Sequence, residues 1–100
     1  MNAFFLTPDA WRDLDSIWQY IAGDSVRNAD SVEEAIFEAC RSAAAMPGSG
    51  HKKEGVRRPD VLFLGVAAYE HYSIAYLAKS EPLRVLRVVH GARDVPRLIR

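Results

Sequence analysis

The sequence predicts an α+β fold, in which an N-terminal strand and an antiparallel helical hairpin pack on a twisted antiparallel β-sheet. Two amphipathic segments with helical spacing fill the first half of the chain, and three runs rich in Val, Leu, Ile, Tyr and Phe fill the second. The breaker segment Pro47 to Gly50 separates the two halves. Because the chain has 100 residues, 49% of them hydrophobic, we expect a single domain spanning residues 1–100.

The first element is expected to be a short strand, because Ala3 to Leu6 is an apolar run. A helix then starts at Thr7-Pro8, since Thr caps free N–H groups and Pro suits the first helical position. An apolar stripe follows at three- and four-residue steps: Trp11, Leu14, Ile17, Trp18 and Ile21. We expect both tryptophans to pack in the core and the helix to end at Gly23.

A second amphipathic helix is predicted from about Val26 to Met46. Because so few residues join the two helices, they are expected to form an antiparallel hairpin. The lone cysteine, Cys40, lies on the apolar face of the second helix, which indicates a buried thiol. With one cysteine, no intrachain disulfide is possible.

The second half of the chain is expected to form the sheet. The strand candidates are Val61 to Val66, Tyr69 to Ala78 and Leu83 to His90. Residues 51–59, HKKEGVRRP, predict a basic loop before the first of them. Because alternate residues of a strand share a face, Tyr72 and Tyr76 are expected on the same side. The helices can cover one face of the sheet, and we expect the other face, or an open edge, to be left for a partner.

Charge is divided between the two halves, although the net charge of the chain is zero. Residues 1–50 hold three basic and eight acidic side chains, a net of −5, and residues 51–100 hold ten basic and five acidic, a net of +5. The second half is therefore expected to present a basic surface to an acidic protein or to a phosphate backbone. Neutralisation of one half by the other within the fold is the alternative.

Two arginines interrupt the β-branched run of the last strand. Arg84 and Arg87 are three residues apart, so strict alternation places them on opposite faces. The arginine that faces the helices needs a carboxylate, and Asp13 and Asp15 are the candidates. Arg87 is therefore either half of a structural ion pair or a contact to a partner, and both alternatives stand.

The order of the elements and four landmarks resemble the RelE/ParE superfamily of toxins from bacterial type II toxin–antitoxin pairs. The landmarks are LTPDAWRDLDSIWQYIA at 6–22, MPGSGHKKEGV at 46–56, YEHYSIAYL at 69–77 and LRVLRVVHGARD at 83–94. The resemblance covers nearly the whole chain, and HGARD after a β-branched strand is its most specific part. The sequence looks more like the ParE branch, often described as plasmid-stabilisation proteins, than like the RelE branch.

The resemblance to ParE implies a toxin that poisons DNA gyrase by binding it. It also implies a cognate antitoxin, whose acidic C-terminal segment becomes ordered on the toxin. The basic second half of the chain fits such a partner. The residues expected to contact partners are Arg57, Arg58, Arg87, Arg93, Arg97 and Arg100. A degenerate toxin that retains only antitoxin binding is a further alternative.

The RelE branch implies a different activity, the cleavage of mRNA on the ribosome. Metal-free RNA cleavage needs a base, an acid and cations that hold the phosphate. The resemblance would give the cationic role to Lys53, Arg58 and Arg93, but residues 95–100 hold no Tyr or His to act as the acid. His90 is a substitute for that acid, although a histidine at a strand end is more often structural. We therefore favour a binder without catalytic residues and keep the endonuclease as the alternative.

Membrane and metal functions are not indicated by the sequence. Its apolar runs fall short of the roughly twenty residues of a membrane span. The N-terminus lacks the basic start of a signal peptide, so a cytoplasmic protein is expected. His51, His71 and His90 do not have metal-ligand spacing. We therefore expect neither a metal nor a cofactor.

Overall fold

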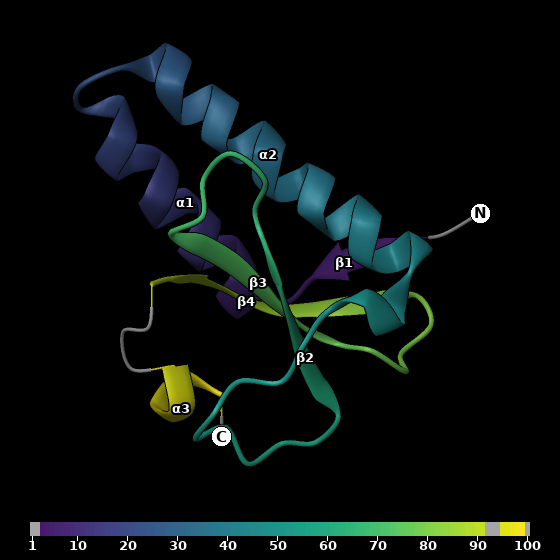
Figure 1. The fold of residues 1–100 in the computed structure, drawn as a ribbon. Helices are drawn as coiled ribbons and strands as arrows, with labels where there is room; N and C mark the ends of the chain where they lie inside the picture. The colour runs from purple at the N-terminus through teal and green to yellow at the C-terminus, as the bar shows by residue number, and fades with distance from the viewer. Residues whose placement is uncertain (1–2, 92–94, 100) are drawn as a thin grey trace.

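The computed structural model describes residues 3–91 and 95–99 and confirms the α+β class (Figure 1). In chain order the elements are β1 (Phe4–Leu6), α1 (Pro8–Ala22), α2 (Val26–Ala45), a short 3-10 turn (Pro47–Ser49), β2 (Val61–Gly65), β3 (Tyr72–Leu77), β4 (Leu83–His90) and α3 (Val95–Leu98). The helical hairpin lies on one side of the sheet. The loop that precedes β2 and the short α3 lie on the other side.

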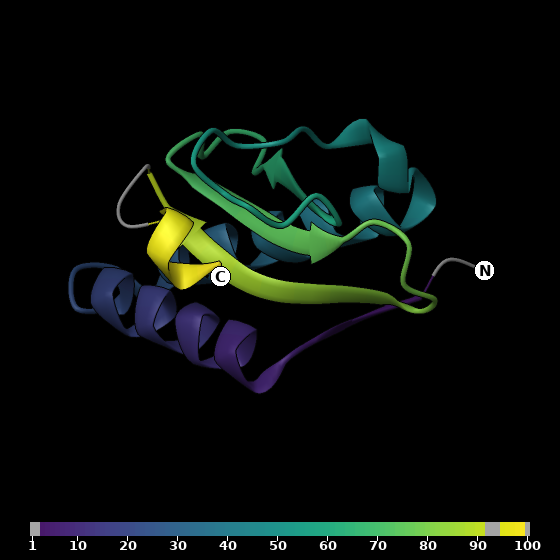
Figure 2. The same cartoon turned by 90° about the horizontal axis from the view of Figure 1, so that it is seen from below.

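The four strands form one sheet in the order β1-β4-β3-β2. The strands β2, β3 and β4 are antiparallel neighbours as predicted, whereas β1 runs parallel to β4. The sheet is therefore mixed rather than wholly antiparallel. A three-residue strand carries no sequence signal for its direction, which depends on where the following helix has to begin. Figure 2 shows β1 at the margin of the sheet, leading directly into α1.

Side-chain caps fix the starts of both long helices. The Thr7 hydroxyl accepts a hydrogen bond from the Ala10 N–H at 3.2 Å, and the Ser25 hydroxyl accepts one from the Asn28 N–H at 3.1 Å. Thr7 also donates to the Leu86 carbonyl at 2.8 Å, which ties the start of α1 to β4. The hairpin therefore begins and ends close to the predicted residues. Within residues 3–91 and 95–99, none of the helices is long and apolar enough to cross a membrane.

Two hydrophobic clusters cover the two faces of the sheet. The cluster on the helical side joins β-sheet residues such as Ile74 and Val85 to Leu14 and Ile36 of the hairpin. The cluster on the other side consists of Val61, Phe63, Ala75, Val89 and Ile99, with Val56 packed against it. This second face is therefore covered by the chain's own loop and C-terminal segment and is not left open for a partner, whereas the alternative of an open edge stays a prediction. Figure 2 shows α3 lying against β4.

The two tryptophans do not pack in the core as expected. The side chain of Trp11 is 52% exposed and lies against Phe37 of α2, with ring centroids 6.0 Å apart. Trp18 is half-buried, and its indole N–H donates to the Asp30 carboxylate at 2.9 Å. The small side chain of Ala10 is fully buried instead, which lets α1 approach the sheet closely. The face of α1 that is buried therefore centres on Ala10 and Leu14, and the two tryptophans of the predicted apolar stripe lie at its margin.

A buried tyrosine fixes the turn that leads into the basic loop. Tyr76 has no exposed surface, and it shares the helical side of the sheet with Tyr72, as alternation predicted. Its hydroxyl donates to the Pro47 carbonyl at 2.7 Å and accepts from the Gly50 N–H at 3.0 Å. Burial raises the pKa of this hydroxyl. His51 then forms a single antiparallel bridge with Phe63, which positions the following loop on the edge of β2.

Cys40 is expected to be unreactive in the folded protein. The thiol is fully buried, and burial raises its pKa to about 12. At pH 8 only about one thiol in ten thousand would be the reactive thiolate, even if a reagent could reach it. An aromatic disulfide reagent should therefore leave the native protein unmodified and modify it completely in concentrated urea. Rapid native modification would contradict the burial of Cys40.

Candidate functional site

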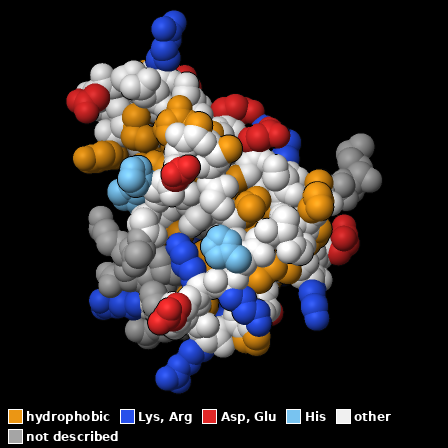
Figure 3. Space-filling view, in the orientation of Figure 1, with side chains coloured by type: hydrophobic (Ala, Val, Ile, Leu, Met, Phe, Trp, Pro, Cys, Tyr) orange, Lys and Arg blue, Asp and Glu red, His pale blue; other side chains and the backbone are white. Residues whose placement is uncertain are grey.

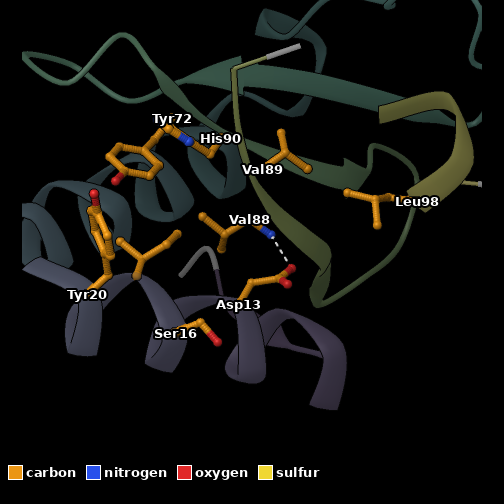
Figure 4. Close-up of a pocket in the computed structure, with 9 residues that line it drawn as sticks. Asp13, Ser16, Tyr20, Tyr72, Val88, Val89, His90 and Leu98 are labelled. Atoms are coloured by element: carbon orange, nitrogen blue, oxygen red, sulfur yellow. Dashed lines mark hydrogen bonds between the residues drawn. The ribbon is translucent and has the colours of Figure 1, made fainter. Parts of the chain in front are cut away.

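A groove opens between α1 and the C-terminal end of β4 (Figure 4). Its volume is about 450 Å³, and its lining consists of Asp13, Ser16, Ile17, Tyr20, Tyr72, Val88, Val89, His90 and Leu98. The strand β1 pairs with β4 only as far as Val85, so residues 86–90 of β4 have no strand on that side. Helix α1 runs beside this part of β4. The groove therefore results from the short length of β1.

One end of the groove is aromatic. Tyr20 of α1 and Tyr72 of β3 point toward each other across it in Figure 4. The rings of Tyr72 and His90 lie 4.8 Å apart between centroids, with 31° between their planes. Burial raises the pKa of Tyr72, and the nearby Tyr20 adds to the effect. Because Tyr20 is 84% exposed, its ring is accessible to a partner, and tyrosine supplies large contact area at interfaces.

An ion pair joins α1 to β4 beside the groove, which Asp13 lines and Arg87 does not. Arg87 donates to both oxygens of Asp13, from Nε at 2.7 Å and from Nη2 at 2.8 Å. Asp13 also accepts the Val88 N–H at 3.0 Å, a backbone group on the part of β4 that β1 does not reach. The hydrogen bonds to Asp13 raise the pKa of Arg87 further, so the arginine stays charged. Of the two alternatives for Arg87, the structure shows the ion pair.

The expectation that Arg84 and Arg87 lie on opposite faces is wrong. In the pairing of β3 with β4, Ala75 faces Arg87 and Tyr76 faces Val85, which leaves Leu86 as the extra residue of a bulge. Cross-strand neighbours share a face, and Ala75 belongs to the cluster on the side away from the hairpin. Both arginines therefore leave the strand on that side, although the Arg87 guanidinium pairs with Asp13 of α1.

The loop before β2 places four predicted cations on the side of the sheet opposite the hairpin. Lys52 and Arg57 are exposed. Lys53 lies over the Phe63 ring, 5.2 Å from its centroid. Arg58 is paired with Asp60 at 2.9 Å. The predicted contact residues Arg57 and Arg58 are thus on the surface or close to it, and one of them already has a carboxylate.

The proposed nuclease cations are only partly brought together. Arg58 and Arg87 line one small cavity of about 280 Å³, together with Thr7, Asp9, Leu86, Leu98 and Ile99. Lys53 is not among the residues lining it. Arg93 and Arg100 lie outside the described residues, whereas Arg97 of α3 is exposed. In this cavity both arginines are engaged by carboxylates, Asp60 and Asp13, which reduces their capacity to hold a transition-state phosphate.

The described residues offer no preformed metal site. Within residues 3–91 and 95–99 there is no group of three or more His, Cys, Asp or Glu side chains suited to a metal ion. His71 and His90 lie edge to face with ring centroids 6.1 Å apart, and His51 is far along the chain in the basic loop.

Sequence reasoning missed two of the residues that shape the groove. Tyr20 falls outside the predicted apolar stripe of α1, and the partner contacts predicted for the C-terminal segment are Arg97 and Arg100 and not Leu98. Tyr20 could have been identified as a large aromatic residue on the polar face of an amphipathic helix, because exposed aromatic side chains often mark interaction sites. The position of Leu98 depends on tertiary packing and has no local signal.

Comparison with known proteins agrees with this architecture. The model of the family described as the ParE toxin of type II toxin–antitoxin systems, parDE, matches residues 4–95. No curated protein sequence matches. Among solved structures, a chain of the chromosomal ParDE toxin–antitoxin system from P. aeruginosa is similar in fold, with a TM-score of 0.72 and 21% identity. The match covers 91% of this chain and 97% of that one. Because the family model spans nearly the entire sequence, the chain belongs to the ParE toxin family of type II toxin–antitoxin systems.

Proposed function

We propose that this toxin arrests bacterial growth by binding DNA gyrase, and that a cognate antitoxin neutralises it through the groove between α1 and β4. The observation that carries the proposal is the ParE family match over residues 4–95. Gyrase is the target that the resemblance to ParE implies. The engaged state of Arg58 and Arg87 supports a binder over a ribosome-dependent endonuclease.

The groove has the chemistry of a site for an amphipathic segment. Its floor is aliphatic, with Ile17, Val88 and Leu98, and its rim carries the exposed Tyr20. A partner helix or extended segment with aliphatic anchors would bury this apolar surface. The acidic residues of the antitoxin tail would then meet the exposed arginines nearest to α3, with Arg97 as the first candidate.

A supercoiling assay with purified gyrase, ATP and relaxed plasmid tests the target. The folded toxin is expected to inhibit supercoiling in a dose-dependent way, while a heat-unfolded sample has no effect. Relaxation of plasmid by a type I topoisomerase is the matched control, and it should be unaffected. Unchanged gyrase activity at a large molar excess of toxin would contradict gyrase as the target.

The substitution Tyr20→Ser is expected to weaken antitoxin binding about 30-fold, because an exposed tyrosine at the edge of an apolar groove is a typical hot spot. The stability of the free toxin should not change. Val26→Ser is the matched control, since Val26 is also an exposed apolar residue of the hairpin but does not line the groove. Titration of each variant with the cognate antitoxin measures the two affinities. Equal affinities for the two variants would place the antitoxin elsewhere.

A further inference from the structure

Charge is sorted between two layers of this neutral protein. The eight acidic residues of the first half all lie on α1, on α2 or in the turn between them. The loop 51–60 and α3, which we name the basic layer, lie on the other side of the sheet. Figure 3 shows Lys and Arg side chains gathered over this lower part of the molecule, while acidic side chains predominate over the hairpin. The sheet thus separates a negative layer from a positive one.

The cations of the basic layer come from two segments that pack side by side. Val56 of the loop and Ile99, next to α3, pack in the same hydrophobic cluster. The loop carries the exposed cations Lys52 and Arg57, and α3 carries the exposed Arg97, so all three belong to these two packed segments. The loop has two acidic residues, of which Asp60 is paired with Arg58 and Glu54 is exposed.

The basic layer lacks what a protein partner would need. The cores of protein interfaces are apolar and contain large anchoring side chains. The exposed large apolar residues of the described chain are Phe5, Trp11, Tyr20, Val26, Met46 and Leu98. Leu98 is the one member of this set in the basic layer, and it lines the groove. A phosphate backbone needs no apolar anchor, and the guanidinium groups of Arg57 and Arg97 match phosphate oxygens in geometry.

We propose that the basic layer binds the phosphate backbone of duplex DNA without sequence preference. The acidic hairpin on the opposite side of the sheet is repelled by the same phosphates, so the protein binds in one orientation, with α1 and α2 facing away. The groove between α1 and β4 adjoins this contact at α3, because Leu98 of α3 lines the groove. The inference goes beyond gyrase and antitoxin binding, and its first test, binding to a labelled duplex, needs neither protein.

Such a contact has a measurable signature in its dependence on salt. Each phosphate that is neutralised contributes about −0.9 to the slope of log affinity against log salt concentration. With Lys52, Arg57 and Arg97 as the contacts, the expected slope is about −3. The affinity should lie in the range of non-specific binding, with a Kd of about 10⁻⁴ to 10⁻⁶ M, and it should be equal for unrelated duplex sequences.

Fluorescence anisotropy with a labelled duplex, titrated with the intact toxin at several salt concentrations, tests the proposal. The double variant Arg57→Gln/Arg97→Gln should weaken binding at least tenfold and reduce the slope to about −1. The matched control is Arg12→Gln/Arg27→Gln, which removes the same charge from exposed positions on the hairpin and should leave the slope unchanged. All four arginines are exposed, and thermal unfolding of each variant confirms that the fold is kept.

Two outcomes would overturn the proposal. If both double variants weaken DNA binding equally, the attraction depends on total charge and not on the basic layer. If a polyglutamate peptide binds the layer more tightly than the duplex at the same salt concentration, the surface is built for an acidic protein segment. Loss of DNA binding with intact gyrase inhibition, or the reverse, separates this inference from the proposed function.

Discussion

Replacement of Gly50 by alanine is expected to lower the free energy of unfolding by about 3 kcal/mol. An added Cβ would collide with the Tyr76 hydroxyl and lie 2.8 Å from the Phe63 carbonyl oxygen and 3.1 Å from the Leu62 Cβ. Tyr76 has no space to move aside, because its ring is fully buried and its hydroxyl bonds to the backbone of Pro47 and Gly50. The substitution therefore overpacks the core and breaks both hydrogen bonds.

Gly48 provides the matched control for this prediction. It lies in the same turn, and no atom stands within 4 Å of the position that its Cβ would occupy. Gly48→Ala should therefore change the stability by less than about 0.5 kcal/mol. Urea unfolding followed by circular dichroism measures both variants. A similar loss in both, or none in either, would mean that the Tyr76 hydroxyl does not hold the turn as described.

The substitution Asp13→Asn is expected to cost about 2 kcal/mol of stability. It removes the carboxylate that neutralises Arg87 and leaves a half-buried guanidinium without its counter-charge, since the two side chains are 22% and 17% exposed. The Val88 N–H can still bond to the amide oxygen, so the loss comes mainly from the charge. The partial exposure keeps the cost below that of a fully buried pair.

Asp15 is the matched control, because it is an exposed carboxylate on the same helix. Asp15→Asn should leave the stability within about 0.5 kcal/mol of the parent. Adding Arg87→Met to Asp13→Asn should restore part of the loss, because removing both charges abolishes the uncompensated one. Chemical unfolding of the parent, Asp13→Asn, Arg87→Met and the double variant gives the coupling energy between the two positions. If the two single losses simply added in the double variant, Arg87 would be independent of Asp13.

The helical hairpin could be predicted because its signals are local. Thr7 and Ser25 cap the two helices within a residue of the predicted starts, and a breaker segment follows the second helix. The strand β4 has its predicted bounds for a similar reason, since it is an uninterrupted β-branched run between a turn and a glycine. These elements depend on residues a few positions apart, which a sequence displays directly.

The failures concern relations between distant segments. The bulge at Leu86 follows from how β4 fits β3, and it shifts Arg87 to the face of Arg84. The exposure of Trp11 depends on how closely α1 approaches the sheet at Ala10. The covering of the second face by Ile99 depends on how Ile99 packs against Val89 of β4. None of these relations has a periodic pattern in the sequence.

The candidate site divides in the same way. The cations of the basic loop were identified from composition, because charge is readable without a fold. The groove was not, since it is formed by α1, β4 and α3 where β1 ends. The sequence predicts Asp13 or Asp15 as the carboxylate that pairs with an arginine facing the helices. In the structure Asp13 is that residue, and it also accepts a hydrogen bond from the Val88 N–H of β4.

The topology of a reporter plasmid in cells that express this toxin tests the central claim, that the protein acts by binding gyrase and not by cutting RNA. Soon after induction, the plasmid is expected to lose negative supercoils or to become linear, and co-expression of the antitoxin should prevent the change. Growth arrest with a normally supercoiled plasmid, accompanied by transcripts that end within the ribosomal A site, would contradict it.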